Sequence, residues 1–196
     1  MAGASAGVAA AGAVGVGAGA GVGSAGAATP TAQAESDAKR LHRLLSVELL
    51  LLFCYQHVLA SSVLTPRAQR GLTPLRTHEE AHVRVLRARL AVLGTPAPQP
   101  PAGVAAADRA LAHRRVKGRL GQLQSSRDAV HLVLDLERVT LGAYFVALTK
   151  LDDPGLITLG AQIMAGEAQH EAMIGELLYP GSAQKAVPYA IVQGVQ

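Results

Sequence analysis

The chain has 196 residues and a formal net charge of +4, with 18 basic side chains, 14 acidic ones and one cysteine. This length predicts one domain with a tail and a sizeable core, and the lone cysteine excludes a disulfide framework or a thiolate zinc site within one chain. The mild positive charge is too weak to indicate nucleic acid as a partner. Leu, Ala, Val and Arg dominate after residue 35, which favours an all-α domain.

Residues 1–34 carry no charged side chain and are almost pure Ala, Gly and Val as far as residue 28. Dense glycine opposes a stable helix and the stretch is only weakly apolar, so we expect no membrane span. Two interpretations stay open: a disordered low-complexity tail, or an export signal that ends in small residues. Residues 3–10 resemble the middle of a twin-arginine signal peptide, without its arginine pair. We therefore expect an exported protein, otherwise a cytoplasmic one.

The first long helix is predicted over residues 36–62, with Ser36 as its N-cap and Asp37 in an acidic first turn. The run 47–53 is apolar on nearly every side except at Glu48, which indicates burial on several sides of this helix.

A second long helix is predicted from Thr65-Pro66, a cap followed by proline at the first helical position, to Leu93. Gly94 and a proline-rich linker follow, and then a short helix over 105–122. Its exposed face carries a basic run that suits a solvated surface better than nucleic acid. The run consists of Arg109, His113, Arg114, Arg115, Lys117 and Arg119.

Two more long helices are predicted, over residues 126–150 and 154–178, the latter opened by Asp153-Pro154. Short connections make each sequential pair antiparallel, whereas the long connection after Leu93 lets the second and third long helices run in the same direction. This arrangement is a four-helix bundle with one long crossover, spanning residues 35–180. We expect residues 181–196 to form an extended tail.

Each long helix carries one glutamate within its apolar stripe, and two of these glutamates are followed three residues later by a histidine. Residues spaced i, i+3 lie on the same side of a helix, and burying a carboxylate beside an imidazole is costly unless something binds them. Di-iron and di-manganese proteins use this pattern: a glutamate from each of two helices and Glu-x-x-His from each of the other two. The predicted ligands are Glu48, Glu79, His82, Glu137, Glu167 and His170. Carboxylate oxygens with one imidazole per metal suit iron or manganese, with zinc as a further candidate.

On these motifs, residues 36–180 resemble the ferritin-like superfamily, specifically its bacterial and often exported ferritin-like proteins. The resemblance implies that Glu48 and Glu137 are terminal ligands and that Glu79 and Glu167 bridge two metals, each completed by one histidine. It also implies reaction of ferrous iron with oxygen or peroxide. A homo-oligomer is a further expectation, whereas cage assembly and iron storage are left open.

Tyr55 and Tyr144 each follow a ligand glutamate by seven residues, which is two helical turns. They are candidates for hydrogen bonds to the ligands or for redox-active groups, and core packing is the role we favour. Cys54, in an apolar run, is expected to be a small core residue.

Other interpretations compete with the dinuclear site. His78-Glu79-x-x-His82 also matches the zinc-peptidase helix, in which two histidines bind zinc and the glutamate is the general base. It leaves Glu48, Glu137 and the second Glu-x-x-His unexplained, so we expect His78 to be a neighbour of the site. A metal-free bundle would have to hold six ionisable groups in its core without a counter-ion. A non-catalytic metal-binding or stress-protection protein on the same bundle is the functional alternative.

Overall fold

The computed structural model describes residues 32–186, and this part of the chain is helical throughout its regular structure. The expected export signal, apart from its last residues, and most of the expected extended tail lie outside the described residues. The elements in chain order are α1 (Ala32–Ala60), α2 (Pro66–Val92), α3 (Val104–His113), the 3₁₀ turn η1 (Leu120–Gln122), α4 (Ser126–Leu148), α5 (Pro154–Leu178) and α6 (Ala183–Ala186).

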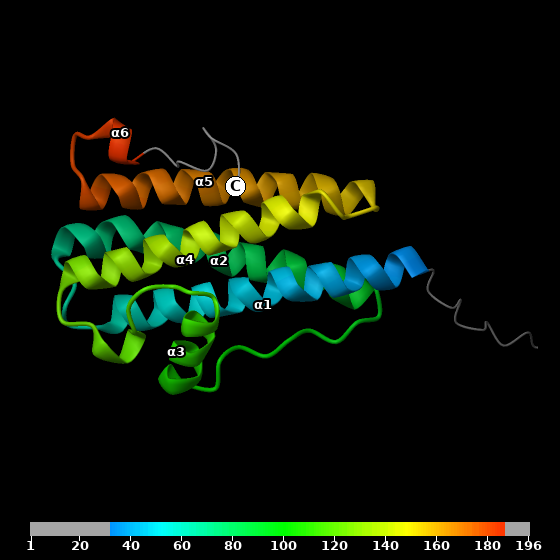
Figure 1. Ribbon diagram of the computed structural model, residues 1–196, viewed down its shortest axis with the longest axis horizontal. Helices are drawn as coiled ribbons and strands as arrows, with labels where there is room; N and C mark the ends of the chain where they lie inside the picture. The colour runs from blue at the N-terminus through cyan, green and yellow to red at the C-terminus, as the bar shows by residue number, and fades with distance from the viewer. Residues whose placement is uncertain (1–31, 187–196) are drawn as a thin grey trace, which may run out of the picture.

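Four of these helices form the bundle that the sequence predicts (Figure 1). Helix α1 packs against α2 and α4, and α5 packs against the same two helices from the opposite corner. Sequential helices are antiparallel, whereas the crossover returns along the bundle so that α4 runs in the same direction as α2 (Figure 1). The predicted all-α fold class is thereby confirmed.

The predicted starts of α2 and α5 are confirmed at the level of hydrogen bonds. Thr65 Oγ1 accepts from the backbone N of Ala68 at 3.3 Å, and Asp153 Oδ1 accepts from that of Leu156 at 2.8 Å. Helix α4 is capped by Ser125, one residue before the predicted Ser126. A cap can sit at either of two adjacent serines without changing the periodic face that follows, so the pattern alone does not separate them.

The predicted start of α1 at Ser36 is wrong, because the helix already begins at Ala32 and Asp37 lies inside it. The Asp37 carboxylate is buried and accepts from the backbone N of Asp153 at 2.9 Å and that of Asp152 at 3.2 Å. Arg40 donates to the same carboxylate at 2.9 Å. Asp37 therefore holds the α4–α5 connection to α1, a long-range role that local capping rules do not predict.

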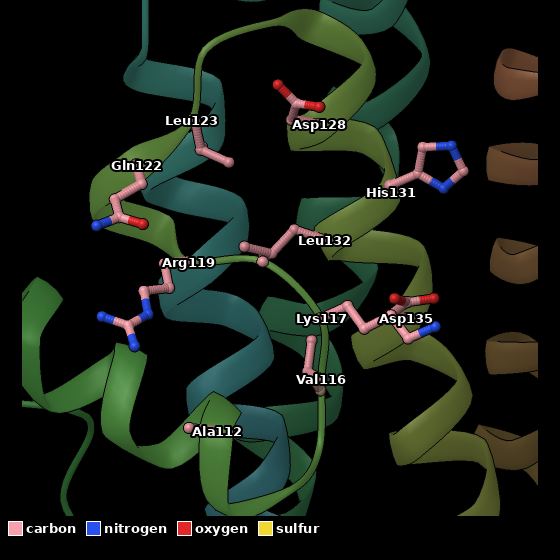
Figure 2. A pocket seen from close by; sticks show the side chains of 11 residues that line it. Ala112, Val116, Lys117, Arg119, Gln122, Leu123, Asp128, His131, Leu132 and Asp135 are labelled. Carbon is pink, nitrogen blue, oxygen red and sulfur yellow. The ribbon is translucent and has the colours of Figure 1, made fainter.

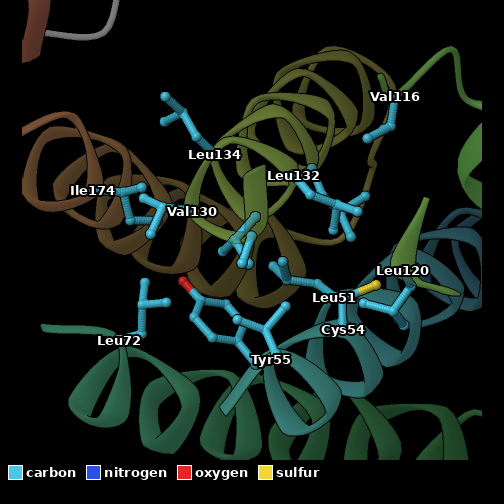
Figure 3. Packing of buried hydrophobic residues seen from close by; sticks show 14 of the residues in the cluster. Leu51, Cys54, Tyr55, Leu72, Val116, Leu120, Val130, Leu132, Leu134 and Ile174 are labelled. Atoms are coloured by element: carbon cyan, nitrogen blue, oxygen red, sulfur yellow. The ribbon is translucent and has the colours of Figure 1, made fainter. Parts of the chain in front are cut away.

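The single helix predicted over 105–122 is also wrong, because α3 ends at His113 and the chain then turns. Arg115 has φ 59° and Gly118 has φ 90°, left-handed conformations that interrupt a helix. The Asp108 carboxylate accepts from the backbone N of Leu120 at 2.6 Å, which closes this turn back onto α3. Val116 and Leu120 join the apolar cluster that contains Cys54, with Leu120 next to Cys54, so the crossover becomes part of the core (Figure 3).

The apolar core consists of two clusters, one toward each end of the bundle. One contains Leu51, Cys54, Tyr55, Leu72 and Ile174, and Figure 3 shows how these residues interdigitate. The other gathers residues nearer the opposite ends of the same helices, among them Leu41, Leu45, Leu86, Leu90 and Tyr144. On every long helix, the predicted ligands lie between the stretches that build the two clusters.

Residues Ser36–Ala60 of α1 are long and apolar enough to cross a membrane, by length and composition. In the structure 56% of the tested window is buried, and the helix packs against α2, α4 and the crossover. Burial on several sides accounts for this composition, as the sequence predicts for the run around Glu48.

The C-terminal residues that the structure describes include a short helix where an extended tail was expected. Helix α6 packs against α5, and its Ala186 lies against Gly175, where a side chain would have no room. The prediction for residues 187–196 lies outside the described residues.

Candidate metal centre

Four glutamates meet at the middle of the bundle, one from each long helix. Glu48 on α1, Glu79 on α2, Glu137 on α4 and Glu167 on α5 each have 0% of their surface exposed. Each occupies a position in its helix where the apolar stripe would otherwise place a leucine or valine. The helical period that builds the core thus also delivers four carboxylates to one place.

The two histidines of the Glu-x-x-His motifs complete this cluster, one turn along from the glutamates of α2 and α5. His82 Nδ1 lies 3.0 Å from Glu167 Oε1, 3.4 Å from Glu79 Oε2 and 3.9 Å from Glu48 Oε2. Its imidazole therefore faces carboxylates of three different helices.

His170 has an equivalent environment on the other side. Its Nδ1 lies 2.8 Å from Glu79 Oε1, 3.6 Å from Glu137 Oε1 and 4.0 Å from Glu167 Oε2. The two imidazole rings are 5.9 Å apart between centroids, and both turn Nδ1 toward the carboxylates. The cluster is thus arranged as two similar halves.

The six side chains form two overlapping groups that could each hold a metal ion. In each group, one ligand atom per residue lies within 4.8 Å of all the others. Glu79 and Glu167 belong to both groups and are the only members they share. One group is Glu48, Glu79, His82 and Glu167; the other is Glu79, Glu137, Glu167 and His170.

Most polar atoms of this cluster are buried without hydrogen bonds, a geometry that suits a cation. Both oxygens of Glu79 and of Glu167, and Nδ1 of His82 and of His170, have no hydrogen-bond partner among the described residues. Several N···O distances are short, but the directions are not those of hydrogen bonds. Orphaned buried carboxylates cost several kcal/mol unless a positive charge compensates them. Two divalent ions would balance the four carboxylates and leave both imidazoles neutral, so the donor set fits a dinuclear centre.

Without a metal, burial distorts the ionisation of the carboxylates. Burial, followed by the charge of Glu79, raises the pKa of Glu48 well above its usual range. Burial and the charge of Glu137 raise the pKa of Glu167 well above its usual range, and the pKa of Glu79 is also raised for the same two reasons. Burial also acts to raise the pKa of Glu137, but its interactions with Glu167 and His170 and the hydrogen bond from Tyr55 outweigh burial and lower the value. Protons would therefore occupy part of the cluster in the metal-free protein.

The two histidines respond to this environment in opposite directions. Burial lowers the pKa of His82. Burial also acts to lower the pKa of His170, but its interactions with Glu137 and Glu79 dominate and raise the value to about 10. In the metal-free protein a proton on His170 takes the place that a metal would occupy.

Tyr55 and Tyr144 donate hydrogen bonds to two of the four carboxylates, in addition to the core packing predicted for both. Tyr144 donates from its hydroxyl to Glu48 Oε1 at 2.5 Å, and Tyr55 donates to Glu137 Oε1. Each tyrosine thus reaches the glutamate of the neighbouring helix and not the one on its own helix. Both rings are fully buried in the apolar clusters, so packing and hydrogen bonding are combined.

His78 is a neighbour of the cluster, as expected, and belongs to neither four-residue group. Its Nδ1 lies 3.0 Å from His170 Nε2, on the side of that ring away from the carboxylates. This placement does not support the zinc-peptidase arrangement, because His78 and His82 do not converge on one position. His131 is likewise apart from the cluster and packs edge-on against Tyr179.

Sequence analysis missed one buried acid beside the cluster. Glu171 follows His170 and has 2% of its surface exposed, and its Oε1 accepts from Arg138 Nε at 2.7 Å. Arg138 in turn follows Glu137, so this ion pair ties α4 to α5 directly behind two of the predicted ligands. The spacing of Glu171 four residues after Glu167 is the signal that could have indicated its burial.

A surface hollow of about 670 Å³ lies away from the cluster, between the crossover and α4. Lys117, Arg119, Asp128, His131 and Asp135 are among its lining residues (Figure 2). The acidic and imidazole side chains are spread along α4 in this view and do not converge. Within residues 32–186 they form no group that could hold a metal.

The fold and the cluster together define a helical bundle with a buried carboxylate–histidine centre. Residues 36–180 match the family described as "Ferritin-like domain". The chain belongs to this family, as the sequence motifs indicated. It is also similar in fold to a conserved hypothetical protein, rv2844, from Mycobacterium tuberculosis, with a TM-score of 0.63 and 16% sequence identity over 77% of this chain and 96% of that chain. No curated protein matches the sequence.

Proposed function

We propose that the cluster binds two metal ions, iron or alternatively manganese, and that the protein oxidises Fe(II) with oxygen or peroxide as the electron acceptor. The observation that carries this proposal is the sharing of Glu79 and Glu167 by two groups of potential ligands. Two carboxylates common to two positions are what a bridged dinuclear centre requires. Carboxylate oxygens with a single imidazole per ion favour iron or manganese.

In this proposal each residue type has one task. Glu79 and Glu167 would be shared by the two ions, Glu48 and Glu137 would each bind one ion, and His82 and His170 would complete one ion each. The bound ions would supply the redox chemistry. The tyrosine hydroxyls fix the terminal carboxylates, as their hydrogen bonds to Glu48 and Glu137 indicate. The two apolar clusters restrict bulk water on either side of the centre.

The test is aerobic oxidation of Fe(II) by the full chain after removal of metals. We expect two ferrous ions to bind without oxygen, followed by oxygen uptake and ferric product faster than in buffer. Glu167→Gln keeps the size of a bridging residue and removes its charge, so it should lose dinuclear binding and the rate together. Glu80→Gln is the matched control, because Glu80 is a partly exposed partner of Arg76 outside both groups. Binding of two iron ions without an Fe(II) oxidation rate above that of buffer would contradict the oxidase proposal.

That last outcome would instead support a non-catalytic metal-binding protein. The enclosure of the centre favours this second candidate, because all four carboxylates are fully buried and a closed site is typical of structural metal binding. Metal analysis of the protein as isolated distinguishes iron and manganese from zinc. Binding of fewer than two ions would contradict both candidates.

A further inference from the structure

The two Glu-x-x-His motifs differ in the residue that precedes each glutamate. An offset of 88 positions takes Glu79 to Glu167 and His82 to His170. The same offset takes His78 to Gly166. The two halves of the cluster are therefore alike in their ligands but unlike at this neighbouring position, where one half has an imidazole and the other has no side chain.

His78 supports the His170 ring from behind. The two rings are stacked with centroids 5.2 Å apart and an interplanar angle of 23°, and His78 Nδ1 lies 3.0 Å from His170 Nε2. When Nδ1 of His170 binds a metal, its remaining proton must be on Nε2, so that Nε2–H donates to Nδ1 of His78. This contact fixes both the tautomer and the orientation of His170.

His82 lacks such support. A Cβ atom at position 166 would lie 3.6 Å from His82 Nε2, so Gly166 occupies the supporting position without offering a hydrogen-bond acceptor. No hydrogen bond to His82 Nε2 is found within residues 32–186. The His82 side chain is also the more accessible of the two histidine ligands, with 14% of its surface exposed against 2% for His170.

We propose that His78 is a positioning residue that makes the two metal positions inequivalent. The position completed by His170 holds its ion more tightly, and the position completed by His82, beside Gly166, is the one that loads last and exchanges first. This inference rests on the proposed dinuclear centre. Removing the partner of a ligand histidine typically costs 10- to 100-fold in metal affinity, and we expect roughly this difference between the positions.

The two positions can be measured separately by the rate at which bound Co²⁺ is released to a chelator. The visible absorption of the protein-bound ion monitors this release. The wild-type full chain should bind two Co²⁺ ions and release them in two phases. His82→Ala should remove the fast phase and His170→Ala the slow one, which assigns each phase to a position. Two ions released in a single phase would overturn the inference and leave the dinuclear centre intact. Failure to bind two ions would instead contradict the proposed function.

The role of His78 is tested in the variants His82→Ala and His170→Ala, each of which keeps only one of the two histidine ligands. His78→Ala should accelerate release roughly 10- to 100-fold when only the His170 position is intact, and leave release unchanged when only the His82 position is intact. His78→Asn, whose Oδ1 can accept the same hydrogen bond, should restore slow release. An equal effect in both backgrounds, or no rescue by asparagine, would mean a general structural role and contradict the inference.

Gly166 allows the reverse experiment. Gly166→Ser adds a Cβ at ordinary contact distance from His82 Nε2, together with a hydroxyl that can accept a hydrogen bond from this nitrogen, and should slow release from the His82 position. Gly166→Ala is the matched control, because it adds the same Cβ without an acceptor. Slower release in both variants would show that covering the histidine matters and that hydrogen bonding does not, which would contradict the proposed mechanism.

Discussion

Each of the two buried tyrosine hydroxyls donates to one carboxylate of the cluster, so its contribution to stability can be measured by a single substitution. Tyr144→Phe keeps the buried ring and removes the hydrogen bond that acts to lower the pKa of Glu48. We expect the metal-loaded protein, in which Glu48 is ionised, to lose about 1–3 kcal/mol of unfolding free energy. Urea denaturation at neutral pH measures this loss.

The matched control is Tyr179→Phe, because Tyr179 lies against Arg127 and Lys185, away from the cluster. It should change stability by less than about 0.5 kcal/mol. Equal losses in the two variants would contradict a specific role for Tyr144.

At the scale of residues, the six potential ligands were predictable and their hydrogen-bond partners were not. Glutamate and histidine in an apolar stripe break the helical period, so the sequence itself marks them. The partner of Tyr55 or Tyr144 depends instead on how two helices cross, and a pattern within one helix contains no information on this. Asp37 is a similar case, since its backbone partners lie 115 and 116 residues away.

At the scale of elements, the contact between α5 and α6 depends on a glycine. A Cβ at Gly175 would lie 2.7 Å from the backbone Cα of Ala186, and a backbone atom cannot move aside as a flexible side chain can. We expect Gly175→Ala to displace α6 and to cost about 1–3 kcal/mol. Thermal unfolding measures the cost, and hydrogen exchange at residues 183–186 measures the displacement.

Gly142 in the middle of α4 provides the control for this substitution. A Cβ there would meet nothing within 4 Å, so Gly142→Ala should stabilise the helix by roughly 0.5–1 kcal/mol. A stabilising effect at both glycines would show that α6 does not depend on the close approach at Gly175.

Helices α2, α4 and α5 were predicted closely because each combines a strong apolar period with a cap or proline at its start. The apolar period located α1 as well, but its start was misplaced because Asp37 lies inside the helix. Residues 105–122 of the crossover were predicted as one helix because the apolar side chains of Leu111 and Leu120 lie on either side of a turn. The turn arises from the left-handed conformations of Arg115 and Gly118 and from the long-range bonds of Asp108. Glycine at position 118 weakens a helix, but a glycine alone does not predict that the chain reverses there.

At the scale of the whole molecule, the carboxylate cluster interrupts an otherwise continuous core, so the stability of the bundle should depend on pH and metal together. In the metal-free fold the pKa values of Glu48, Glu79 and Glu167 are raised. A raised carboxyl pKa contributes stability that is present below about 4.5, the unfolded value, and is lost as the pH rises through the folded value.

His170 acts in the same direction, because its pKa is raised to about 10, and its contribution is lost as the pH rises toward that value. His82 and His78 oppose this trend because their pKa values are lowered, whereas the lowered pKa of Glu137 acts only below about 4.5. In the neutral range two lowered groups therefore stand against four raised ones. The metal-free protein should therefore lose stability between about pH 5.5 and pH 7.5, while bound ions replace the protons and remove the loss.

We expect the increase in thermal midpoint caused by metal to be larger at the higher pH. Each ion at about 100 times its dissociation constant stabilises a fold by about 2.7 kcal/mol, which corresponds to roughly 5–10 °C per ion for a chain of this size. Calorimetry of the metal-free and the Mn²⁺-loaded protein at about pH 5.5 and pH 7.5 measures this difference, with manganese chosen to avoid oxidation during the scan. The variant Glu167→Gln should lose part of the pH dependence of the metal-free protein, because one of the raised carboxyls is gone. A metal-induced increase that is the same at both pH values would contradict the view that protons and metal ions compete for these carboxylates.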